Sequence, residues 1–261
     1  LETRPTAVSL PNGIRYVMQR LMQARDTITN TVDLKVYTLK VADQFIEDSE
    51  RAVQRIGEMG AKRLKDGDVI LTHCHSSAMV EVIKTAWEQG KKIQVYSTET
   101  RPRFQGRITA KTLGQLGIPV TMIVDSAVRY FMNEIDKVIV GADAITANGA
   151  LVNKVGTSLI ALAAHEARTL FFVAAETYKF SPETMVGELV VIEERTSSEV
   201  ISPKQLNSMK NVTVRNPSFD VTPAEYIDLI ITERGIIPPQ GAMTILQDLY
   251  GWFIGEKMGF P

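Results

Sequence analysis

The sequence predicts an α/β fold: a Rossmann-like, doubly wound and mostly parallel sheet, preceded by a small helical N-terminal region. Short apolar runs rich in β-branched residues recur between residues 69 and 231. Segments of helical length separate these runs, and such alternation is typical of right-handed βαβ units and a parallel sheet. The 261 residues are enough for one large domain with a smaller helical piece in front of it.

The first 65 residues favour helices. Between residues 32 and 46, apolar side chains recur at steps of three and four residues, and charged side chains fall between them. We therefore expect a long amphipathic helix over residues 30–65, whose apolar face needs a partner surface, and a shorter helix over residues 12–25. We place one domain boundary near Lys65, which gives a helical region at 1–65 and a Rossmann-like α/β domain at 66–261.

Seven apolar runs downstream of this boundary are expected to form strands. Near-continuous runs of this kind are typical of strands that are buried on both faces of a parallel sheet. Turn signals such as Gly67, Gly90 and Gly117-Ile118-Pro119 lie between them. The expected strands cover residues 69–71, 93–96, 120–124, 137–140, 170–173, 189–192 and 227–231.

Charge and composition exclude several classes of protein. The formal net charge of −1 gives no electrostatic footprint for direct nucleic-acid binding or for an anionic membrane. No apolar run approaches the roughly 20 residues that span a bilayer. Cys74 is the only cysteine, which excludes an internal disulfide, so we expect a cytoplasmic protein. Residues 1–6 do not form a signal peptide and lack an initiator Met, so we expect the natural N-terminal region to be truncated here.

Polar side chains follow five of the expected strands, at the point where each strand ends. In an open parallel sheet, ligands bind beyond the carboxyl ends of the strands. The convergence of these segments therefore predicts an active site at that edge of the sheet. The segments are residues 72–77, 97–102, 125–127, 141–144 and 174–179.

Cys74 and Asp143 are the two candidates for chemistry at that edge. A thiol at a strand end can act as acid, base or nucleophile, although a lone cysteine is more often a small core residue. A carboxylate at the end of an apolar strand is costly unless it is hydrogen-bonded or employed in proton transfer. The alternative for Asp143 is a cap on the following turn.

A metal or cofactor site finds little support. Neighbouring side chains on an extended strand point to opposite faces, so His73, Cys74 and His75 cannot jointly hold one metal ion, and the same alternation argues against either histidine activating the thiol unless the chain turns at once. His165 lies in an expected helix. The sequence also lacks a Gly-rich dinucleotide fingerprint and a Gly-x-Ser-x-Gly elbow, so hydride-transfer and esterase functions have no warrant.

Two segments offer groups that bind phosphate. Arg101 lies in a loop before Pro102 and is the favoured ligand, because a guanidinium grips phosphate through a planar fork. Arg103 and Arg107, four residues apart, also fit a solvated helix face. Residues 153–158 precede an expected helix, where backbone N–H groups and Lys154 suit an anion, although an ordinary N-cap is the alternative. The lysine precedes the only glycine, so this is no nucleotide P-loop.

Motifs along nearly the whole chain resemble one known family. They are Arg4-Pro-Thr-Ala-Val8, Thr98-Glu-Thr-Arg-Pro102 with Gln105-Gly106, Gly141-Ala-Asp143, Asn148-Gly149, Asn153-Lys-Val-Gly-Thr157, Asn216-Pro-Ser-Phe-Asp-Val-Thr-Pro223 and Ile231-Thr-Glu-Arg-Gly235. The family contains the regulatory subunits of translation initiation factor 2B, methylthioribose-1-phosphate isomerase and archaeal ribose-1,5-bisphosphate isomerase. The isomerases have a cysteine after the first strand and an aspartate in Gly-Ala-Asp, and this sequence has both.

The resemblance implies an aldose–ketose isomerase that converts ribose 1,5-bisphosphate to ribulose 1,5-bisphosphate in nucleotide (AMP) salvage, without metal or cofactor. The segment Thr72-His-Cys-His-Ser76 is similar to the archaeal bisphosphate enzymes. Methylthioribose-1-phosphate isomerases instead have Asn-x-Gly after the cysteine and Arg after the aspartate, where this chain has His75-Ser76-Ser77 and Ala144. By resemblance, Cys74 and Asp143 supply the acid and the base. The residues implied to bind hydroxyls and phosphates are Arg4, Ser76, Arg101, Gln105, Asn153, Lys154 and Lys179.

Two alternatives remain within the same family. The chain is similar to a non-catalytic regulatory subunit that binds translation initiation factor 2, and to methylthioribose-1-phosphate isomerase. The family also carries a helical region ahead of Arg4, with a phosphate-binding Arg-Gly-Ala stretch that this sequence lacks. Its members assemble into dimers and often hexamers, so we expect a homodimer or homohexamer.

Overall fold

The computed structural model describes residues 6, 8–25 and 27–258, with side chains up to Gly251. Its α-helices are α1 (Ser9–Ala24), α2 (Thr31–Ala61), α3 (Ser77–Glu88), α4 (Gln105–Gln115), α5 (Val128–Phe131), α6 (Thr157–Ala167), α7 (Pro203–Asn207) and α8 (Ala242–Met258). Its strands are β1 (Val69–Thr72), β2 (Gln94–Thr98), β3 (Val120–Ile123), β4 (Lys137–Val140), β5 (Ala144–Ile145), β6 (Leu151–Lys154), β7 (Leu170–Ala174), β8 (Phe219–Thr222), β9 (Leu229–Thr232) and β10 (Gly235–Ile237).

The main sheet has seven strands in the order β10-β9-β7-β4-β1-β2-β3. All neighbours are parallel except β10, which pairs antiparallel with β9 at the edge. The chain runs outward from β1 to β3, then returns to β4 beside β1 and continues outward to β9. This reversal is the topological switch point of a doubly wound fold, so the predicted fold class is confirmed. A second, antiparallel sheet has the order β5-β6-β8.

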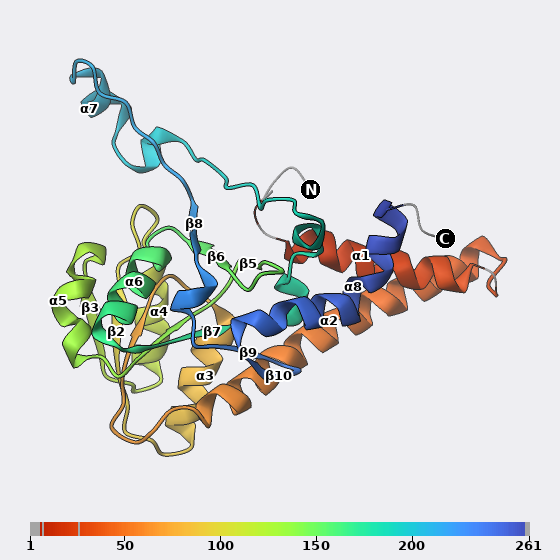
Figure 1. The fold of residues 1–261 in the computed structure, drawn as a ribbon, viewed down its shortest axis with the longest axis horizontal. Coiled ribbons are helices and arrows are strands. Elements are labelled where there is room, and N and C mark those ends of the chain that lie inside the picture. Colours follow the sequence, from red (N-terminus) through yellow and green to blue (C-terminus); the bar gives the residue numbers. More distant parts are fainter. Residues whose placement is uncertain (1–5, 7, 26, 259–261) are drawn as a thin grey trace.

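Helices cover both faces of the main sheet (Figure 1). Neighbouring residues of a strand enter different cores, because side chains alternate between the two faces. Leu71 of β1 packs in the core that includes Ile160 of α6 and Leu246 of α8, whereas Ile70 packs in the core with Ile56 of α2 and helix α3. Burial on both faces is the reason for the near-continuous apolar runs in the sequence.

The helical region forms from the expected segments. Asn30 begins α2 by accepting a hydrogen bond from the backbone N–H of Val32, and the C-terminal half of α2 packs against α3. The N-terminal half keeps part of its apolar face open in the single chain, where Val32, Val36 and Leu39 are exposed. Among the described residues, no helix combines the length and hydropathy that a membrane span requires.

One expected strand is wrong. Residues 189–192 form no strand, and Leu189 and Val191 are 90% and 65% exposed. Val190 and Ile192 pack against the small core of Val8 and Phe219, so the run alternates in burial, but it pairs with no strand among the residues that the structure describes. The run is the first part of a projecting segment of residues 188–217, here named the arm, which has α7 near its tip (Figure 1).

Candidate active site

The carboxyl ends of β1 and β4 are neighbours at the switch point, and they carry Cys74 and Asp143. Both residues line a cavity of about 640 Å³ at this edge. The topology explains why Cys74 and Asp143 line one cavity. The loops that follow the two strands at a switch point run in opposite directions and leave a crevice between them. The predicted site residues that line this cavity are Cys74, Ser76, Gln105, Asp143, Asn153, Lys154 and Lys179. Arg4 lies outside the described residues.

The backbone at Cys74 turns sharply out of β1. Its φ of 67° is the left-handed conformation, which costs a non-glycine residue about 1–2 kcal/mol. Two threonine hydroxyls secure it: Thr100 Oγ1 accepts from the Cys74 N–H at 2.9 Å, and Thr109 Oγ1 donates to the Cys74 carbonyl at 2.7 Å. Ser76 then caps α3 by accepting from the Met79 N–H. The turn leaves Cys74 half-buried on the cavity wall.

His73 and His75 have structural partners. The buried His73 ring lies 2.6 Å from Thr98 Oγ1 through Nδ1 and 3.0 Å from the Val155 carbonyl through Nε2. A carbonyl only accepts, so we assign the ring proton to Nε2; burial lowers the pKa of His73 and keeps the ring neutral. His75 Nδ1 bonds Thr109 Oγ1 at 2.9 Å. Within the described part of the chain, no group of three or more His, Cys, Asp or Glu side chains is placed to hold a metal ion.

The loop that carries Asp143 lies directly against the loop that carries Cys74. A Cβ atom on Gly141 would lie 2.4 Å from Ser76 Cβ, so glycine at this position permits the close approach. The Asp143 N–H donates to the Val152 carbonyl at 2.9 Å, which ties the loop to the second sheet. The Asp143 side chain is half-buried. The close contact between the Gly141 backbone and the Ser76 side chain therefore helps to set the relative positions of the thiol and the carboxyl group.

Asn153 and Lys154 lie on strand β6 rather than in the loop before α6. Both are buried, at 4% and 8% exposure, yet they border the cavity. Asn153 Nδ2 donates to Thr157 Oγ1 at 3.0 Å, and that hydroxyl donates to the Lys154 carbonyl at 2.6 Å. The Lys154 ammonium lies 4.5 Å from the centre of the Phe219 ring. The first turn of α6 thus holds the Asn153 side chain and the Lys154 backbone, while the Lys154 side chain packs against Phe219 of β8.

Asp220 supports the same turn from β8. Its carboxylate accepts the backbone N–H groups of Gly156 at 2.7 Å and of Ser158 at 3.2 Å. Burial nevertheless raises its pKa from 3.8 to about 6. The folded protein then holds this proton more tightly than the unfolded chain does. Stability from this group is fully present below pH 3.8 and is lost as the pH rises to about 6.

The Asp220→Asn variant tests that dependence. The difference between 3.8 and about 6 corresponds to about 3 kcal/mol. We expect the free energy of unfolding of the parent to fall relative to the variant by up to that amount between pH 4 and pH 7, measured by urea unfolding. Parallel pH profiles for the two proteins would contradict this role of Asp220.

Lys179 reaches the cavity from the 3₁₀-helix Thr177–Lys179, which follows β7. Its ammonium lies 2.9 Å from a carboxylate oxygen of Glu176, a residue only 2% exposed. The Tyr178 hydroxyl donates to the other oxygen at 3.1 Å, and burial together with Glu176 raises the pKa of Tyr178. From α1, Asn12 donates to the carbonyls of Tyr178 and Phe180, each at 2.8 Å. The helical region thereby fixes the segment that presents Lys179.

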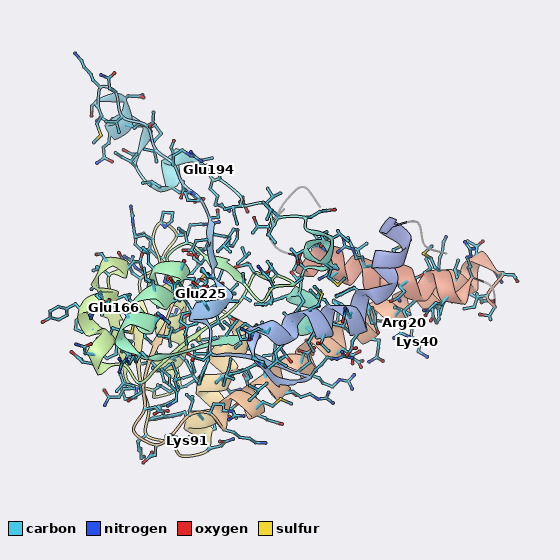
Figure 2. The ribbon with its side chains drawn as sticks, in the orientation of Figure 1. Arg20, Lys40, Lys91, Glu166, Glu194 and Glu225 are labelled. Atoms are coloured by element: carbon cyan, nitrogen blue, oxygen red, sulfur yellow. The ribbon has the colours of Figure 1, made fainter. Side chains whose placement is uncertain are left out.

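Glu176→Gln removes the buried charge beside Lys179 and keeps the side-chain shape. Charge-assisted hydrogen bonds are about twice as strong as neutral ones, so we expect the KM for a phosphorylated substrate to rise about tenfold while kcat changes less. Steady-state kinetics provide the measurement. Glu166→Gln is the matched control, because Glu166 of α6 forms an exposed surface pair with Arg129 of α5 (Figure 2). Equal KM values for parent and Glu176→Gln would contradict the positioning role.

Of the three arginines between residues 101 and 107, Arg103 borders the cavity, whereas the sequence favoured Arg101. Arg101 does not border the cavity: its guanidinium donates to the Val200 carbonyl at 3.2 Å and lies 5.2 Å from the Phe104 ring. Helix α4 begins at Gln105, so Arg103 belongs to the preceding turn and borders the cavity. Arg107 stacks on Phe104 at 3.7 Å and pairs with Glu99.

Arg195 also borders the cavity and carries no local signal in the sequence. It lies on the arm, after Glu193 and Glu194, in a segment whose apolar run predicts a buried strand. Only the folded chain brings it to the cavity that Cys74 borders. Among the described residues that line the cavity, four are cationic and one is a carboxylate, whereas the carboxylates paired with Lys179 and Arg195 lie outside the lining. The groups that face the cavity therefore suit an anionic ligand. The cationic ones are Arg103, Lys154, Lys179 and Arg195, and the carboxylate is Asp143.

Comparison with known proteins agrees with this architecture. The initiation factor 2 subunit family matches residues 1–239. The chain is 58% identical over 252 residues to ribose 1,5-bisphosphate isomerase of Thermococcus kodakarensis, covering 96% of this chain and 78% of that protein. It is also 58% identical over 252 residues to the enzyme of the same name from Methanocaldococcus jannaschii, covering 97% and 79%.

A solved structure shows the same fold. The crystal structure of translation initiation factor eIF-2B from Pyrococcus horikoshii OT3 superposes with a TM-score of 0.76 and 39% identity, covering 90% of this chain and 77% of that one. The sequence match and the fold match extend over most of the chain. This chain is a member of the initiation factor 2 subunit family.

Proposed function

We propose that this protein isomerises ribose 1,5-bisphosphate to ribulose 1,5-bisphosphate, with Cys74 and Asp143 as the acid–base pair. Relatives that bear this enzyme's name, two of them 58% identical, support the choice of substrate. The observation that carries the proposal is the shared cavity, which puts a thiol and a carboxyl group from adjacent strands beside an excess of cationic side chains. A role in nucleotide salvage and assembly into a homodimer or homohexamer stay predictions.

The order of the strands places cationic side chains on both sides of Cys74 and Asp143, which suits a substrate with a charged group at each end. The strands run β7-β4-β1-β2, so their loops present Lys179, Asp143, Cys74 and Arg103 in that sequence. Neighbouring strands lie about 4.8 Å apart, so the outer strands β7 and β2 are separated by about 14 Å. Cations thus flank the acid–base pair on both sides, as a sugar with a phosphate at each end requires.

The chemistry needs one proton donor and one proton acceptor. The 1-phosphate blocks simple ring opening, so ring oxygen O4 must receive a proton as the C1–O4 bond breaks. The hydrogen on C2 moves to C1, and the proton of the C2 hydroxyl leaves as the C2 carbonyl forms. One side chain of the pair gives a proton and the other takes one, so the reaction is balanced with no external oxidant or reductant. Cationic groups that hold the phosphates orient C1 and C2 between them.

The test is direct turnover. Full-length protein is incubated with ribose 1,5-bisphosphate and the ketose product is measured; we expect conversion. A parent protein that yields no ketose but binds translation initiation factor 2 would favour the regulatory function instead. The similarity to the structure named translation initiation factor eIF-2B is the reason to test this alternative. Faster turnover of methylthioribose 1-phosphate in a competition between the two sugars would identify the third candidate.

A further inference from the structure

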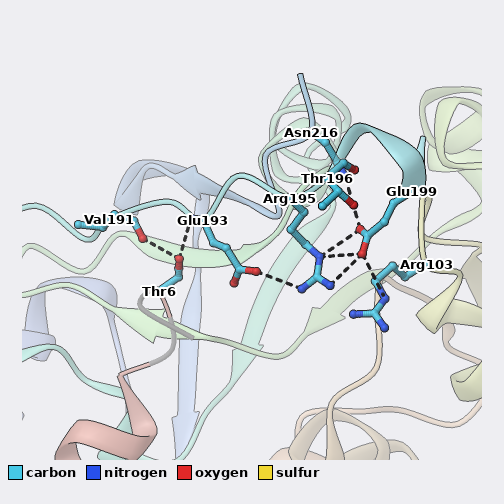
Figure 3. Close-up of polar contacts among 8 residues, drawn as sticks. All are labelled: Thr6, Arg103, Val191, Glu193, Arg195, Thr196, Glu199 and Asn216. Carbon is cyan, nitrogen blue, oxygen red and sulfur yellow. Dashed lines mark hydrogen bonds and ion pairs between the residues drawn. The ribbon is translucent and has the colours of Figure 1, made fainter. Parts of the chain in front are cut away.

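Two arginines on the cavity wall come from segments far apart in the chain and share one carboxylate (Figure 3). Arg103 lies in the turn before α4, and Arg195 lies on the arm. Glu199, also on the arm, approaches both guanidinium groups. We propose that Arg103 and Arg195 bind one of the two phosphate groups of the substrate, and that Glu199 positions Arg195 for it. The inference rests on the proposed function, because it concerns the second phosphate of a bisphosphate.

Arg195 is fixed before any ligand arrives. Its Nε lies 3.0 Å from both Glu199 carboxylate oxygens, its Nη2 lies 2.8 Å from one of them, and its Nη1 donates to Glu193 at 3.0 Å. These contacts use three of the five N–H groups of a guanidinium and leave two for a ligand. Glu199 is held in turn by the Asn216 amide at 3.4 Å. The arginine is therefore oriented without a rotamer cost at the moment of binding.

Arg103 is held much more loosely. Its Nε lies 3.9 Å from Glu199, beyond hydrogen-bond distance, and its side chain is 53% exposed. An exposed ion pair of this kind contributes little to stability, so Arg103 can turn toward a phosphate at small cost. Neither Glu199 nor Glu193 borders the cavity, whereas both arginines do. A phosphate in the cavity thus meets the guanidinium groups first, with the carboxylates behind them.

The pair lies on the opposite side of Cys74 and Asp143 from Lys179. Lys179 lies on the β7 side of Cys74 and Asp143, and Arg103 lies on the β2 side. A monophosphate sugar needs cations at one end only. The Arg103–Arg195 pair gives the opposite end a second set of donors, with the forked geometry that suits phosphate. These residues therefore favour a bisphosphate over a monophosphate.

Steady-state kinetics with ribose 1,5-bisphosphate test the proposal through Arg103→Gln and Arg195→Gln. We expect each variant to raise KM about tenfold or more while kcat stays within about threefold, since a hydrogen bond to a charged group is lost and the acid–base pair is untouched. The inhibition constant of inorganic phosphate should rise in parallel. Glu199→Gln should raise KM less, again with kcat preserved, because it weakens the hold on Arg195 without removing a ligand.

Matched controls exist on the same segments. Arg107 stacks on Phe104 and does not border the cavity. Arg215 forms two hydrogen bonds to the carboxylate of Glu194 on the arm, each at 2.5 Å; Figure 2 labels Glu194. Arg107→Gln, Arg215→Gln and Glu194→Gln should keep the parent's KM. Thermal unfolding checks that each variant folds; Arg103, being exposed, can be replaced safely even if the Arg195 variant is unstable.

The outcomes separate this inference from the proposed function. Unchanged KM in both arginine variants, or equal increases in the control variants, would overturn it while the isomerase stands. If the parent shows no turnover, the proposed function fails, and calorimetric binding of inorganic phosphate tests the pair alone. Weaker phosphate binding by Arg103→Gln and Arg195→Gln supports the inference. Equal binding by parent and variants, or no binding by the parent, overturns it.

Discussion

Replacing Cys74 with Ser, or Asp143 with Asn, should reduce kcat for ribose 1,5-bisphosphate by at least about 100-fold, the usual contribution of a positioned general acid or base. Both residues border the cavity at the switch point, from neighbouring strands. Both substitutions keep side-chain size, so substrate binding should persist. A fixed-time assay of ketose formation, with calorimetric binding of the substrate to each variant, measures the two quantities separately.

Asp33→Asn is the control for the carboxylate substitution. Asp33 lies in the first turn of α2, well away from the cavity wall, and should leave kcat unchanged. Turnover within threefold of the parent in either the Cys74 or the Asp143 variant would remove that residue from the chemistry. Loss of binding together with turnover would indicate a structural role instead.

Gly141→Ala should produce the second large effect. The new Cβ would lie 2.4 Å from Ser76 Cβ and 2.5 Å from Ser76 Oγ, far inside van der Waals contact, so the loops carrying Cys74 and Asp143 must move apart. A misplacement of about 1 Å can cost about 100-fold in rate, and overpacking of this kind costs about 1–3 kcal/mol in stability. We expect both a fall in kcat of that order and a lower urea midpoint.

Gly114→Ala is the matched control for Gly141→Ala. Gly114 lies within α4, and nothing lies within 4 Å of the Cβ it would gain. Alanine there should raise the free energy of unfolding by about 0.5–1 kcal/mol and leave kcat alone, because glycine is a poor helix residue. Equal activity in the two variants would show that the contact between Gly141 and Ser76 does not set the geometry of the pair.

The sheet is predictable from the sequence because each of its buried strands must be apolar on both faces. Residues 69–71 and 137–140 illustrate this, and both form strands close to the expected bounds. The same rule misassigns residues 189–192. An extended run with Val190 and Ile192 packed inward has the composition of a strand, and nothing local shows that a ladder partner is absent. Strand β6 is not predicted, because two of its four residues, Asn153 and Lys154, are polar and the segment is not an apolar run.

The meeting of candidate residues at one cavity is predictable where they follow strands directly. Cys74 and Asp143 do so, and strand order alone brings their loops to one cavity. Arg195 was not predictable, because its place depends on how the arm returns to the sheet. Arg103 borders the cavity instead of the expected Arg101, and this depends on where α4 begins. Helix boundaries shift by one or two residues without changing the sequence pattern.

A crystal structure of the Cys74→Ser variant with ribose 1,5-bisphosphate would show directly whether the sugar binds between residue 74 and Asp143. We expect C1 and C2 of the sugar to lie between residue 74 and Asp143, with one phosphate at Lys179 and the other at Arg103 and Arg195. A sugar bound elsewhere would contradict it, for example in the cavity of about 450 Å³ that Tyr16, Phe45 and Tyr178 border, as would a sugar in the main cavity whose C1 and C2 touch neither residue 74 nor Asp143.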